Sequence, residues 1–511
     1  MAIASSRRNF IRGAFGLAAL GAGDCFAIGS ASGKRIRLAA VGMMGKGYSD
    51  WLPMLKSGLV KIVAFCDCDA NKLVEAKKAL ARDGVALDLA KIPFYTDYRR
   101  LLDDAGTLGV QAMTVSATDH THAPVAIAAM KQGIHVFVQK PLVRTLWELD
   151  YFNKTAKEYG VVTQMGNQGS SLTGFRRGVE VLNSGILGDV TEVHVWTNRP
   201  VWPQGRNAVA AIGKVPSKPM PDALNWDAWL ATAQERPWRP IYHPFHWRGF
   251  FDFGCGAFGD MACHTMNLPF RGLELGAVDT VELRRIEDKT DLAFPAKSIV
   301  VLNYAARSSQ TRPGVNLPAV KLTWYDGNLK PSADLMPQVI AAGLERDKET
   351  GKGKVPNTGC LIVGTRGILC STNDYGGDSY IALKGEEKVV NIKDHEACKA
   401  VAHTIPYRSD SAATQAAQSG YAAISADGHY GEFLNAILGK GPVYAATHSR
   451  CYSDIEYAIP QMEGILVGCV AQRVGLTGAA GVFHWDAKNG RFREEAPNRY
   501  LKPYIRKGFE F

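Results

Sequence analysis

The sequence lacks several features that would assign it to large functional classes. Past Ser32 no apolar run approaches the ~20 residues of a membrane-spanning helix, so we expect no membrane span in the mature protein. The formal charge is +10, but no run of Lys and Arg with interleaved aromatic residues is present, so nucleic acid is not an expected partner. The ten cysteines show no paired C-x-x-C spacing, and no metal site is expected.

What remains is an ordinary globular composition. The chain has 511 residues, of which 46% are hydrophobic and 21% are charged, which leaves room for two domains. No internal repeat is apparent. We expect most cysteines to be small buried hydrophobic residues, as in a chain that folds in the reducing cytoplasm.

The N-terminus has the pattern of an export signal. Ser6-Arg7-Arg8-Asn9-Phe10-Ile11 is followed by a mostly apolar run from Gly13 to Gly29 and by Ser30-Ala31-Ser32. A basic segment, an apolar segment and a small polar exit, in this order, predict a twin-arginine signal peptide over residues 1–32. We therefore expect the protein to be exported already folded and to work in the periplasm.

Residues 33–166 show alternating strand and helix signals. Apolar runs predict strands over 36–42, 60–67, 109–116, 134–138 and 161–165, and helical spacing predicts helices over 70–82, 122–132 and 145–159. Gly133 is expected to close the helix before it. Strands that alternate with helices of this length favour an α/β domain with a doubly wound parallel sheet, a Rossmann fold.

Residues 167–511 have a different texture. Strand signals follow one another without helices of crossover length, at 190–196, 280–285, 298–304, 320–325, 360–364 and 380–383. They predict a second, α+β domain with a largely antiparallel or mixed open sheet. Residues 446–476 have helical spacing, and the tail from Gly481 onwards is expected to be loop-like.

A glycine-rich turn follows the first predicted strand. Gly42-Met43-Met44-Gly45-Lys46-Gly47 is a shifted form of the G-x-G-x-x-G fingerprint, whose glycines let a pyrophosphate approach a helix N-terminus. Asp67 ends the next predicted strand, where a carboxylate can accept hydrogen bonds from the adenosine ribose and would repel a 2′-phosphate. The arrangement predicts binding of NAD in preference to NADP.

Three further segments bring together residue types that carry chemistry. Thr118-Asp119-His120-Thr121-His122 and Val138-Gln139-Lys140-Pro141-Leu142 follow strands at the carboxyl edge, where such sheets bind ligands. Downstream, Asp260 and His264 lie at i, i+4 and would share one helix face. Together with Gln164–Gly169, Asn198–Gly205 and Tyr242–Gly249, these segments resemble an exported branch of the Gfo/Idh/MocA oxidoreductase family. The resemblance is good from Lys34 to about Leu275 and covers the rest in layout only.

The resemblance implies three catalytic roles. Lys140 would lie between the nicotinamide and a substrate hydroxyl, His264 would act as general acid or base, and Asp260 would orient the imidazole or bind a hydroxyl. Many family members carry Glu before the Lys-Pro pair, whereas this chain has Gln139. A neutral amide cannot stabilise the ammonium as a carboxylate would, so we expect Lys140 to deprotonate more readily. Whether Lys140 or His264 is the base stays open.

The remaining candidates are contacts to the two ligands. His120 and His122 are explained equally well as the start of a capped helix. Aromatic residues crowd the second domain, and sugars pack their C–H faces on aromatic rings, so the substrate contacts that we expect are Arg199, Trp202, Tyr242, His243 and Arg248. The expected cofactor contacts are Gly42, Met44, Gly45, Lys46, Asp67, Thr118, His120, His122, Gln139, Lys140, Asn167 and Gln168.

Three functions fit these residues. The first is an NAD-dependent oxidoreductase that acts on a CH–OH group of a sugar or sugar derivative, with a cofactor that stays bound because nicotinamide is scarce outside the cytoplasm. The second is an NAD-dependent glycosidase that oxidises, eliminates and re-reduces. The third is a non-catalytic cofactor-binding sensor or scaffold. From the family, a homodimer or homotetramer formed through the open face of the second sheet is expected.

Overall fold

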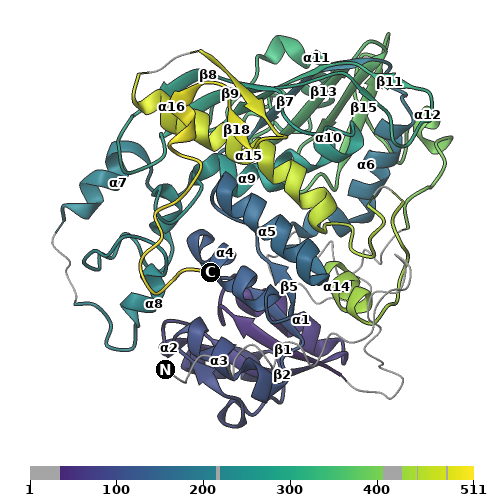
Figure 1. The fold of residues 1–511 in the computed structure, drawn as a ribbon. Coiled ribbons are helices and arrows are strands. Elements are labelled where there is room, and N and C mark those ends of the chain that lie inside the picture. The colour runs from purple at the N-terminus through teal and green to yellow at the C-terminus, as the bar shows by residue number, and fades with distance from the viewer. Residues whose placement is uncertain (1–34, 215–218, 407–427, 446, 479–480) are drawn as a thin grey trace. The chain divides into compact units, whose positions relative to one another are not determined.

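The computed structural model describes residues 35–214, 219–406, 428–445, 447–478 and 481–511. The predicted signal peptide lies outside the described residues. Residues 35–511 form one compact unit that contains two sheets, drawn in Figure 1 with the first sheet below and the second above. Among the described residues, no helix is long and apolar enough to cross a membrane.

The first sheet has six strands in the order β3-β2-β1-β4-β5-β6, and every pair of neighbours is parallel. This order is that of a doubly wound dinucleotide-binding sheet, and its topological switch point lies between β1 and β4. The predicted parallel sheet is therefore confirmed. Its strands are β1 (Ile36–Val41), β2 (Val60–Cys66), β3 (Phe94–Tyr95), β4 (Ala112–Val115), β5 (His135–Val138) and β6 (Thr163–Met165).

Helices cover both faces of this sheet. They are α1 (Lys46–Lys56), α2 (Asn71–Arg82), α3 (Tyr98–Leu108), α4 (Asp119–Met130) and α5 (Leu146–Tyr159). Thr145 and Glu148 form a capping box at the start of α5, which explains why the predicted boundary is met. Gly133 closes α4 as predicted, with a φ of 75° and its N–H on the carbonyl of Met130.

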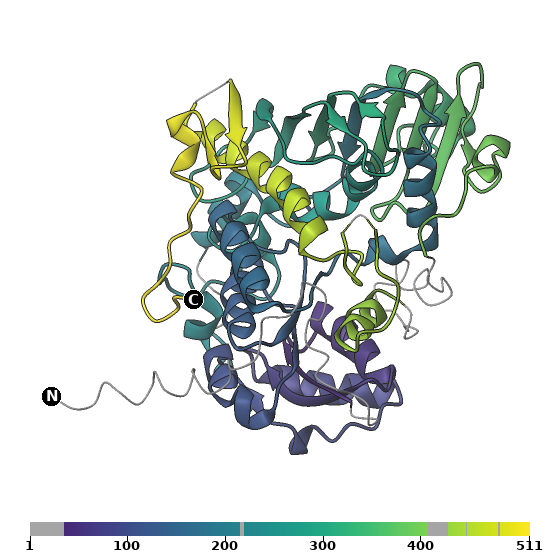
Figure 2. The same cartoon turned by 45° about the vertical axis from the view of Figure 1, so that its right-hand side comes forward.

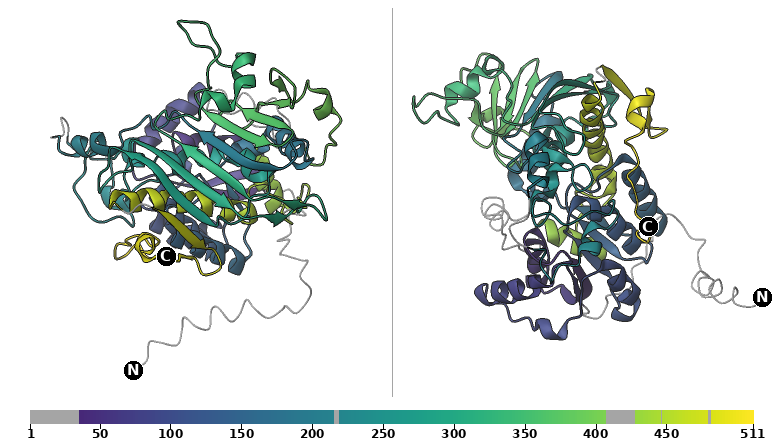
Figure 3. Two further views of the ribbon diagram at one scale, coloured as in Figure 1. Left: turned by 90° about the horizontal axis from the view of Figure 1, so that it is seen from above. Right: turned by 90° about the vertical axis from the view of Figure 1, so that its left-hand side faces the viewer.

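The second sheet has ten strands in the order β16-β15-β14-β13-β7-β12-β9-β8-β17-β18. Only β12 and β7 pair in parallel, so the predicted mixed sheet is confirmed. Figure 3 shows its long strands from above. The strands are β7 (Val190–Trp196), β8 (Thr280–Glu287), β9 (Lys297–Tyr304), β12 (Val320–Tyr325), β13 (Gly359–Gly364), β14 (Gly367–Ser371), β15 (Ser379–Leu383), β16 (Val390–Asn391), β17 (Val482–Asp486) and β18 (Arg491–Phe492); β10 (Arg307–Ser308) and β11 (Asn316–Leu317) form a separate hairpin.

Helices α6, α9 and α15 pack on strands of this sheet, and α10 packs on α6 and α9. The helices that follow the first sheet are α6 (Thr173–Asn183), α7 (Gly205–Ile212), α8 (Trp226–Leu230), α9 (Gly256–Thr265), α10 (Asn267–Gly272), α11 (Pro337–Ala342), α12 (Glu396–Lys399), α14 (His429–Ile437), α15 (Ile455–Leu476) and α16 (Glu495–Asn498). Single 3₁₀ turns are η1 (Leu89–Lys91), η2 (Gln168–Ser171), η3 (His246–Gly249) and η4 (Ala333–Leu335).

Two predictions for the C-terminal part are wrong. The helix predicted from residue 446 begins only at Ile455, because Tyr444 and Ser449 form an isolated bridge that holds the preceding chain in a turn. The tail is not loop-like, since β17 pairs antiparallel with β8 and buries Phe483 and Trp485, a period of two that is too short to recognise in the sequence.

The end of the chain then returns to the first sheet. The carbonyl of Leu501 accepts a hydrogen bond from the Trp147 N–H at 3.0 Å. The Arg99 side chain donates to the carbonyl of Gly508 at 2.9 Å and stacks on the buried ring of Phe509. Residues 482–486 thus pair with the second sheet, and residues 501–509 contact helices α5 and α3 of the first.

Cysteine burial agrees with the sequence. Of the nine cysteines among the described residues, all except Cys68 are buried.

Candidate functional site

The glycine-rich turn lies at the switch point between β1 and β4. Gly42 has a φ of +84°, and a Cβ there would lie 2.2 Å from the carbonyl oxygen of Ser116 at the end of β4. A Cβ on Gly47 would lie 1.9 Å from the carbonyl oxygen of Gly42. No other residue fits at these two positions, so the backbone of the turn stays tight and open to a ligand at the start of α1.

Asp67 is tied directly to this turn. One carboxylate oxygen accepts the Met43 N–H at 2.9 Å, and the other accepts the Asp69 N–H at 3.1 Å. Each oxygen keeps a second lone pair for a ribose hydroxyl. Burial raises the pKa of Asp67 to about 6, against the lowering effect of these backbone hydrogen bonds. The structure thus places the carboxylate at the end of β2, beside the turn, as predicted.

We expect Asp67→Ser to relax the preference for NAD over NADP by at least about tenfold. The substitution removes the charge that would repel a 2′-phosphate and the acceptor that would bind the ribose hydroxyls. The dissociation constants of both cofactors, measured by titration calorimetry, check this. Asp88→Ser, which changes an exposed carboxylate on the loop before β3, is the control. An unchanged preference would argue against the role of Asp67.

We also expect the affinity for NAD to fall below about pH 6. Only the ionised carboxylate accepts from two hydroxyl groups, so bound NAD favours the ionised form of Asp67 and binding weakens as the pH falls through its pKa of about 6. Above that pH the dissociation constant should be flat, and below it the constant should rise up to about tenfold per pH unit. Titrations between pH 5 and 8 test this slope, which Asp67→Ser should lack.

Lys140 and Asp260 join the first sheet to helix α9, which packs on the second sheet. Lys140 follows β5 at the carboxyl edge of the first sheet, and Asp260 lies on α9, as the i, i+4 spacing with His264 predicts. The Lys140 Nζ atom lies 2.8 Å from Asp260 Oδ1 and 3.1 Å from the Asp260 carbonyl oxygen. The Arg248 Nε atom lies 3.5 Å from the same carboxylate oxygen.

This pair sets the charges in the site. Burial acts to raise the pKa of Asp260, but the charges of Lys140 and Arg248 outweigh it and lower the pKa to about 2. Burial acts to lower the pKa of Lys140, but Asp260 outweighs it and the pKa is raised. The prediction that Lys140 deprotonates more readily is therefore wrong: Gln139 supplies no carboxylate, but α9 does.

His264 is a neutral acceptor beside this ion pair. Burial, assisted by the charge of Lys140, holds the pKa of His264 well below 6.5. No hydrogen bond joins Asp260 to the imidazole within the described part of the chain, and His264 Nδ1 is a buried atom without a partner. Asp260 therefore pairs with Lys140 and does not orient His264.

Buried polar atoms without partners indicate where a ligand fits. Asn167 follows β6, is fully buried, and has no hydrogen-bond partner for either side-chain atom among the described residues. Gln168 Oε1 is likewise a buried atom without a hydrogen-bond partner among the described residues. Such groups cost free energy unless something pairs with them. Both lie at the carboxyl edge of the sheet, so with the glycine turn the residues present fit a bound dinucleotide.

The sequence reasoning missed two residues of this site. Asp119 is buried at the start of α4, and burial raises its pKa to about 7 against the opposing charge of Arg248; its Oδ2 atom has no partner in the described structure. Its position in an already recognised segment could have suggested it. Tyr375, in the loop between β14 and β15, lies edge-on to His264 with ring centroids 4.9 Å apart. No sequence signal indicates Tyr375.

Two predicted cofactor contacts are structural instead. His120 is fully buried, and its Nε2 atom lies 2.9 Å from the carbonyl oxygen of Trp229. His122 links the carbonyl groups of Pro141 and Ala117, at 2.8 and 3.2 Å, and so holds together the loops after β4 and β5. The predictions that these rings contact the cofactor are wrong because both are enclosed by protein. Thr118 lies half-buried at the start of α4.

The predicted substrate residues separate into two groups. Arg248 and Arg199 face the site, since Arg199 pairs with Asp374 at 3.6 Å next to Tyr375, and its charge acts on His264. The prediction that Tyr242 contacts the substrate is wrong, because its ring is buried in an aromatic cluster with Phe250 and Phe253.

His243 is half-buried and stays a candidate substrate contact, whereas the prediction for Trp202 is corrected. Burial lowers the pKa of His243, and the charges of Asp69 and Lys72, near the start of α2, also act on it. Trp202 is buried, and its ring centroid lies 5.9 Å from the Cζ atom of the Arg248 guanidinium. The Trp202 ring therefore packs near Arg248, a candidate substrate residue, and has no exposed face on which a sugar could stack.

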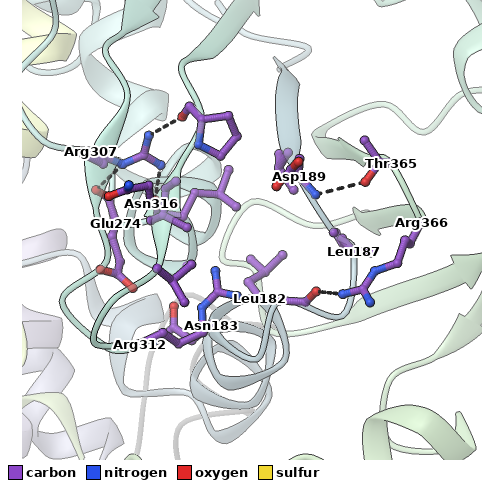
Figure 4. A pocket seen from close by; sticks show the side chains of 18 residues that line it. Leu182, Asn183, Leu187, Asp189, Glu274, Arg307, Arg312, Asn316, Thr365 and Arg366 are labelled. Atoms are coloured by element: carbon purple, nitrogen blue, oxygen red, sulfur yellow. Dashed lines mark hydrogen bonds between the residues drawn. The ribbon is translucent and has the colours of Figure 1, made fainter.

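A pocket of about 290 Å³ lies apart from these residues, and none of them lines it. Figure 4 shows Arg307, Arg312 and Arg366 on its walls. Arg307 donates to the carbonyl groups of Leu273, Glu274 and Pro318, so its guanidinium serves to hold the surrounding loops. Among the described residues, no group of three or more His, Cys, Asp or Glu side chains could hold a metal ion.

Comparison with known proteins agrees with this geometry. Residues 36–167 match the family described as "Oxidoreductase family, NAD-binding Rossmann fold", and residues 177–277 match "Oxidoreductase family, C-terminal alpha/beta domain". A glycosyl hydrolase family 109 protein from Akkermansia muciniphila is 29% identical over 164 residues, which are 30% of this chain and 32% of that protein. An inositol 2-dehydrogenase from Salmonella typhimurium is 27% identical over 158 residues, which are 31% of this chain and 44% of that enzyme.

The matches thus span less than half of either curated relative. Solved structures share the fold over nearly the whole chain at low identity. An inositol dehydrogenase homolog from Azotobacter vinelandii, complexed with NADH and myo-inositol, is 15% identical, with a TM-score of 0.52 over 88% of this chain and 98% of that one. The WlbA dehydrogenase from Bordetella pertussis, in complex with NADH and UDP-GlcNAcA, is 13% identical, with a TM-score of 0.52 over 89% and 99%. The chain belongs to the Gfo/Idh/MocA oxidoreductase family, and its first sheet is the NAD-binding Rossmann domain of that family.

Proposed function

We propose that this protein is an NAD-dependent oxidoreductase that oxidises or reduces a CH–OH group of a sugar or cyclic polyol. The observation that carries the proposal is the 2.8 Å contact between Lys140 and Asp260. It brings a cation from the carboxyl edge of the NAD-binding sheet against the helix that also carries His264. Relatives named as inositol dehydrogenases support the substrate class.

The charges of the three residues suggest their roles. Bound NAD supplies a nicotinamide carbon that accepts or returns a hydride. Lys140 is charged and donates a hydrogen bond to the oxygen of the reacting hydroxyl. His264 is neutral at pH 7 and accepts the hydroxyl proton, because its pKa is held low. Asp260 keeps Lys140 charged and in place.

A second candidate function is an NAD-dependent glycosidase that oxidises a ring hydroxyl transiently. The similarity to a glycosyl hydrolase family 109 protein favours it, and it would use the same three residues. Chromogenic glycosides separate the two functions, because only the glycosidase releases the aglycone without added cofactor.

We further propose that NAD stays bound through turnover, that the twin-arginine signal exports the folded holoenzyme to the periplasm, and that it assembles as a homodimer or homotetramer. The scarcity of nicotinamide outside the cytoplasm supports the first of these.

The test of the bound cofactor is to denature purified protein and identify the released ligand by its ultraviolet and mass spectra. NAD at about one per chain is the expected result, and the holoenzyme should show NADH absorbance when an active polyol is added. A purified protein whose bound NAD no sugar or polyol reduces would favour the sensor or scaffold.

A further inference from the structure

Asp50 is a fully buried carboxylate that four side chains from four elements contact. It lies in α1, one turn after the glycine-rich turn, with no exposed surface. Ser116 Oγ and Gln139 Nε2 donate to Oδ2 at 2.7 and 2.9 Å, from the ends of β4 and β5. Lys46 Nζ and the Tyr430 hydroxyl donate to Oδ1 at 2.5 and 2.6 Å. A buried carboxylate with this many donors fixes the groups around it.

Tyr430 reaches this carboxylate from a distant part of the sequence, on a helix that packs in the core beside the first sheet. It is on α14, which packs beside α1 in Figures 1 and 2 although more than 370 residues separate them. The Tyr430 hydroxyl also accepts a hydrogen bond from Lys46 Nζ at 3.0 Å, and its ring packs on Phe137 with centroids 5.3 Å apart. The ammonium of Lys46 is thus held by two oxygens at once.

Helix α14 is itself anchored at the edge where the cofactor binds. Its first residue, His429, places Nε2 at 2.9 Å from the carbonyl oxygen of Met165 and Nδ1 at 3.1 Å from Ser171 Oγ. Gln164 donates to the carbonyl oxygen of His429 at 2.5 Å. These contacts lock the start of α14 onto the end of β6, next to the unpartnered side chain of Asn167.

The held ammonium lies beside the glycine-rich turn, at the N-terminus of α1. Lys46 is the first residue of α1 after Gly45, where a diphosphate would approach the helix N-terminus. The Lys46 side chain is one-third exposed, so its ammonium is accessible to a ligand beside the glycine-rich turn, and its charge also acts on His264. A lysine side chain is otherwise flexible, and fixing it before binding lowers the entropy that binding must overcome.

We propose that Tyr430 is a cofactor-positioning residue: together with Asp50 it fixes the Lys46 ammonium for the NAD diphosphate, so that helix α14 slows the release of NAD. The inference rests on the NAD-binding assignment, and it gives the proposed retention of the cofactor a physical cause. It does not depend on the identity of the substrate.

The test compares Tyr430→Phe with the wild type and with Tyr48→Phe. Phenylalanine keeps the ring that packs on Phe137 and removes only the hydroxyl. Tyr48 is a matched control, because it lies on α1 with Lys46 and Asp50, is buried, and donates its hydroxyl to Asp83 at 2.8 Å outside this network. We expect Tyr430→Phe to release NADH about tenfold faster, the usual effect of losing one hydrogen bond to a charged group. Tyr48→Phe should release it at the wild-type rate.

A second ligand separates positioning from general loosening of the fold. Adenosine has no diphosphate, so Tyr430→Phe should weaken binding of NADH and leave binding of adenosine unchanged. Lys46→Met should show the same pattern. The melting temperatures of the cofactor-free Tyr430→Phe and Tyr48→Phe proteins should agree.

Two outcomes would overturn the inference. An NADH release rate equal to that of the wild type would show that the hydroxyl has no role, and an equal loss of adenosine binding would show a merely structural one. Wild-type protein that binds NADH but exchanges it freely would contradict the proposed retention, while the comparison of variants stays valid. Wild-type protein that binds no NADH would overturn both.

Discussion

Replacing Lys140 by methionine is expected to lower the rate of bound-NAD reduction by about 10³-fold or more. Methionine keeps the length and packing of the side chain and removes the ammonium that lies 2.8 Å from Asp260. A positioned acid or base contributes about 10²- to 10⁴-fold, and this variant also removes the charge nearest the reacting oxygen. Single-turnover absorbance of bound NADH, with an active polyol in excess, measures the effect.

The control is Lys154→Met. Lys154 is an exposed lysine on α5 that pairs with Asp150, and its loss should leave the rate within about twofold of the wild type. The amount of bound NAD must be equal in all samples, because a variant that has lost its cofactor would also react slowly. A Lys140→Met enzyme with a near-wild-type rate would remove Lys140 from the reaction and leave His264 as the only candidate.

Replacing Glu432 by glutamine is expected to destabilise the fold by about 3 kcal/mol or more. Glu432 on α14 pairs with Arg176 on α6, and neither side chain has exposed surface. Removing one partner of a buried pair leaves an uncompensated charge, which costs about 3–5 kcal/mol. The tyrosine hydroxyl of Tyr444, which also donates to Glu432, cannot replace the lost charge. The free energy of unfolding from denaturant titration measures the change.

The matched control is Glu396→Gln. Glu396 pairs with Lys399 in an exposed helix, where such pairs contribute less than about 1 kcal/mol. Equal shifts in the two variants would mean that the Arg176–Glu432 pair is not a determinant of stability. The comparison also bears on α14, because that helix carries both Glu432 and Tyr430.

Local pattern was enough to predict five of the six strands of the first sheet and the helix of Asp260 and His264, whereas the two-residue strand β3 is too short to recognise. These strands are short apolar runs, and glycines or a capping box mark the turns and helices next to them. Residues close together in the sequence are therefore enough to determine these elements. Spacing of four residues placed Asp260 and His264 on one helix for the same reason. The pairing of Lys140 with that helix followed from the family resemblance and not from spacing.

The incorrect predictions concern contacts between distant residues. Gln139 suggested a weakly held Lys140, but a carboxylate 120 residues away restores the missing charge. The rings of His120 and Tyr242 have suitable chemistry for ligands, yet Trp229 and its aromatic neighbours bury both. Tyr375 and Tyr430 reach the site from loops and helices that no local pattern connects to it.

The strand β17 and the residues that follow it have a consequence for biosynthesis. Residues 482–486 complete an edge of the second sheet, and residues 501–509 then bind Trp147 and Arg99 beside the first. These contacts cannot form until residues 482–509 have left the ribosome, so the surroundings of both sheets stay incomplete until then. A translocase that accepts only completed folds would therefore have to wait until this late segment has been synthesised and has docked.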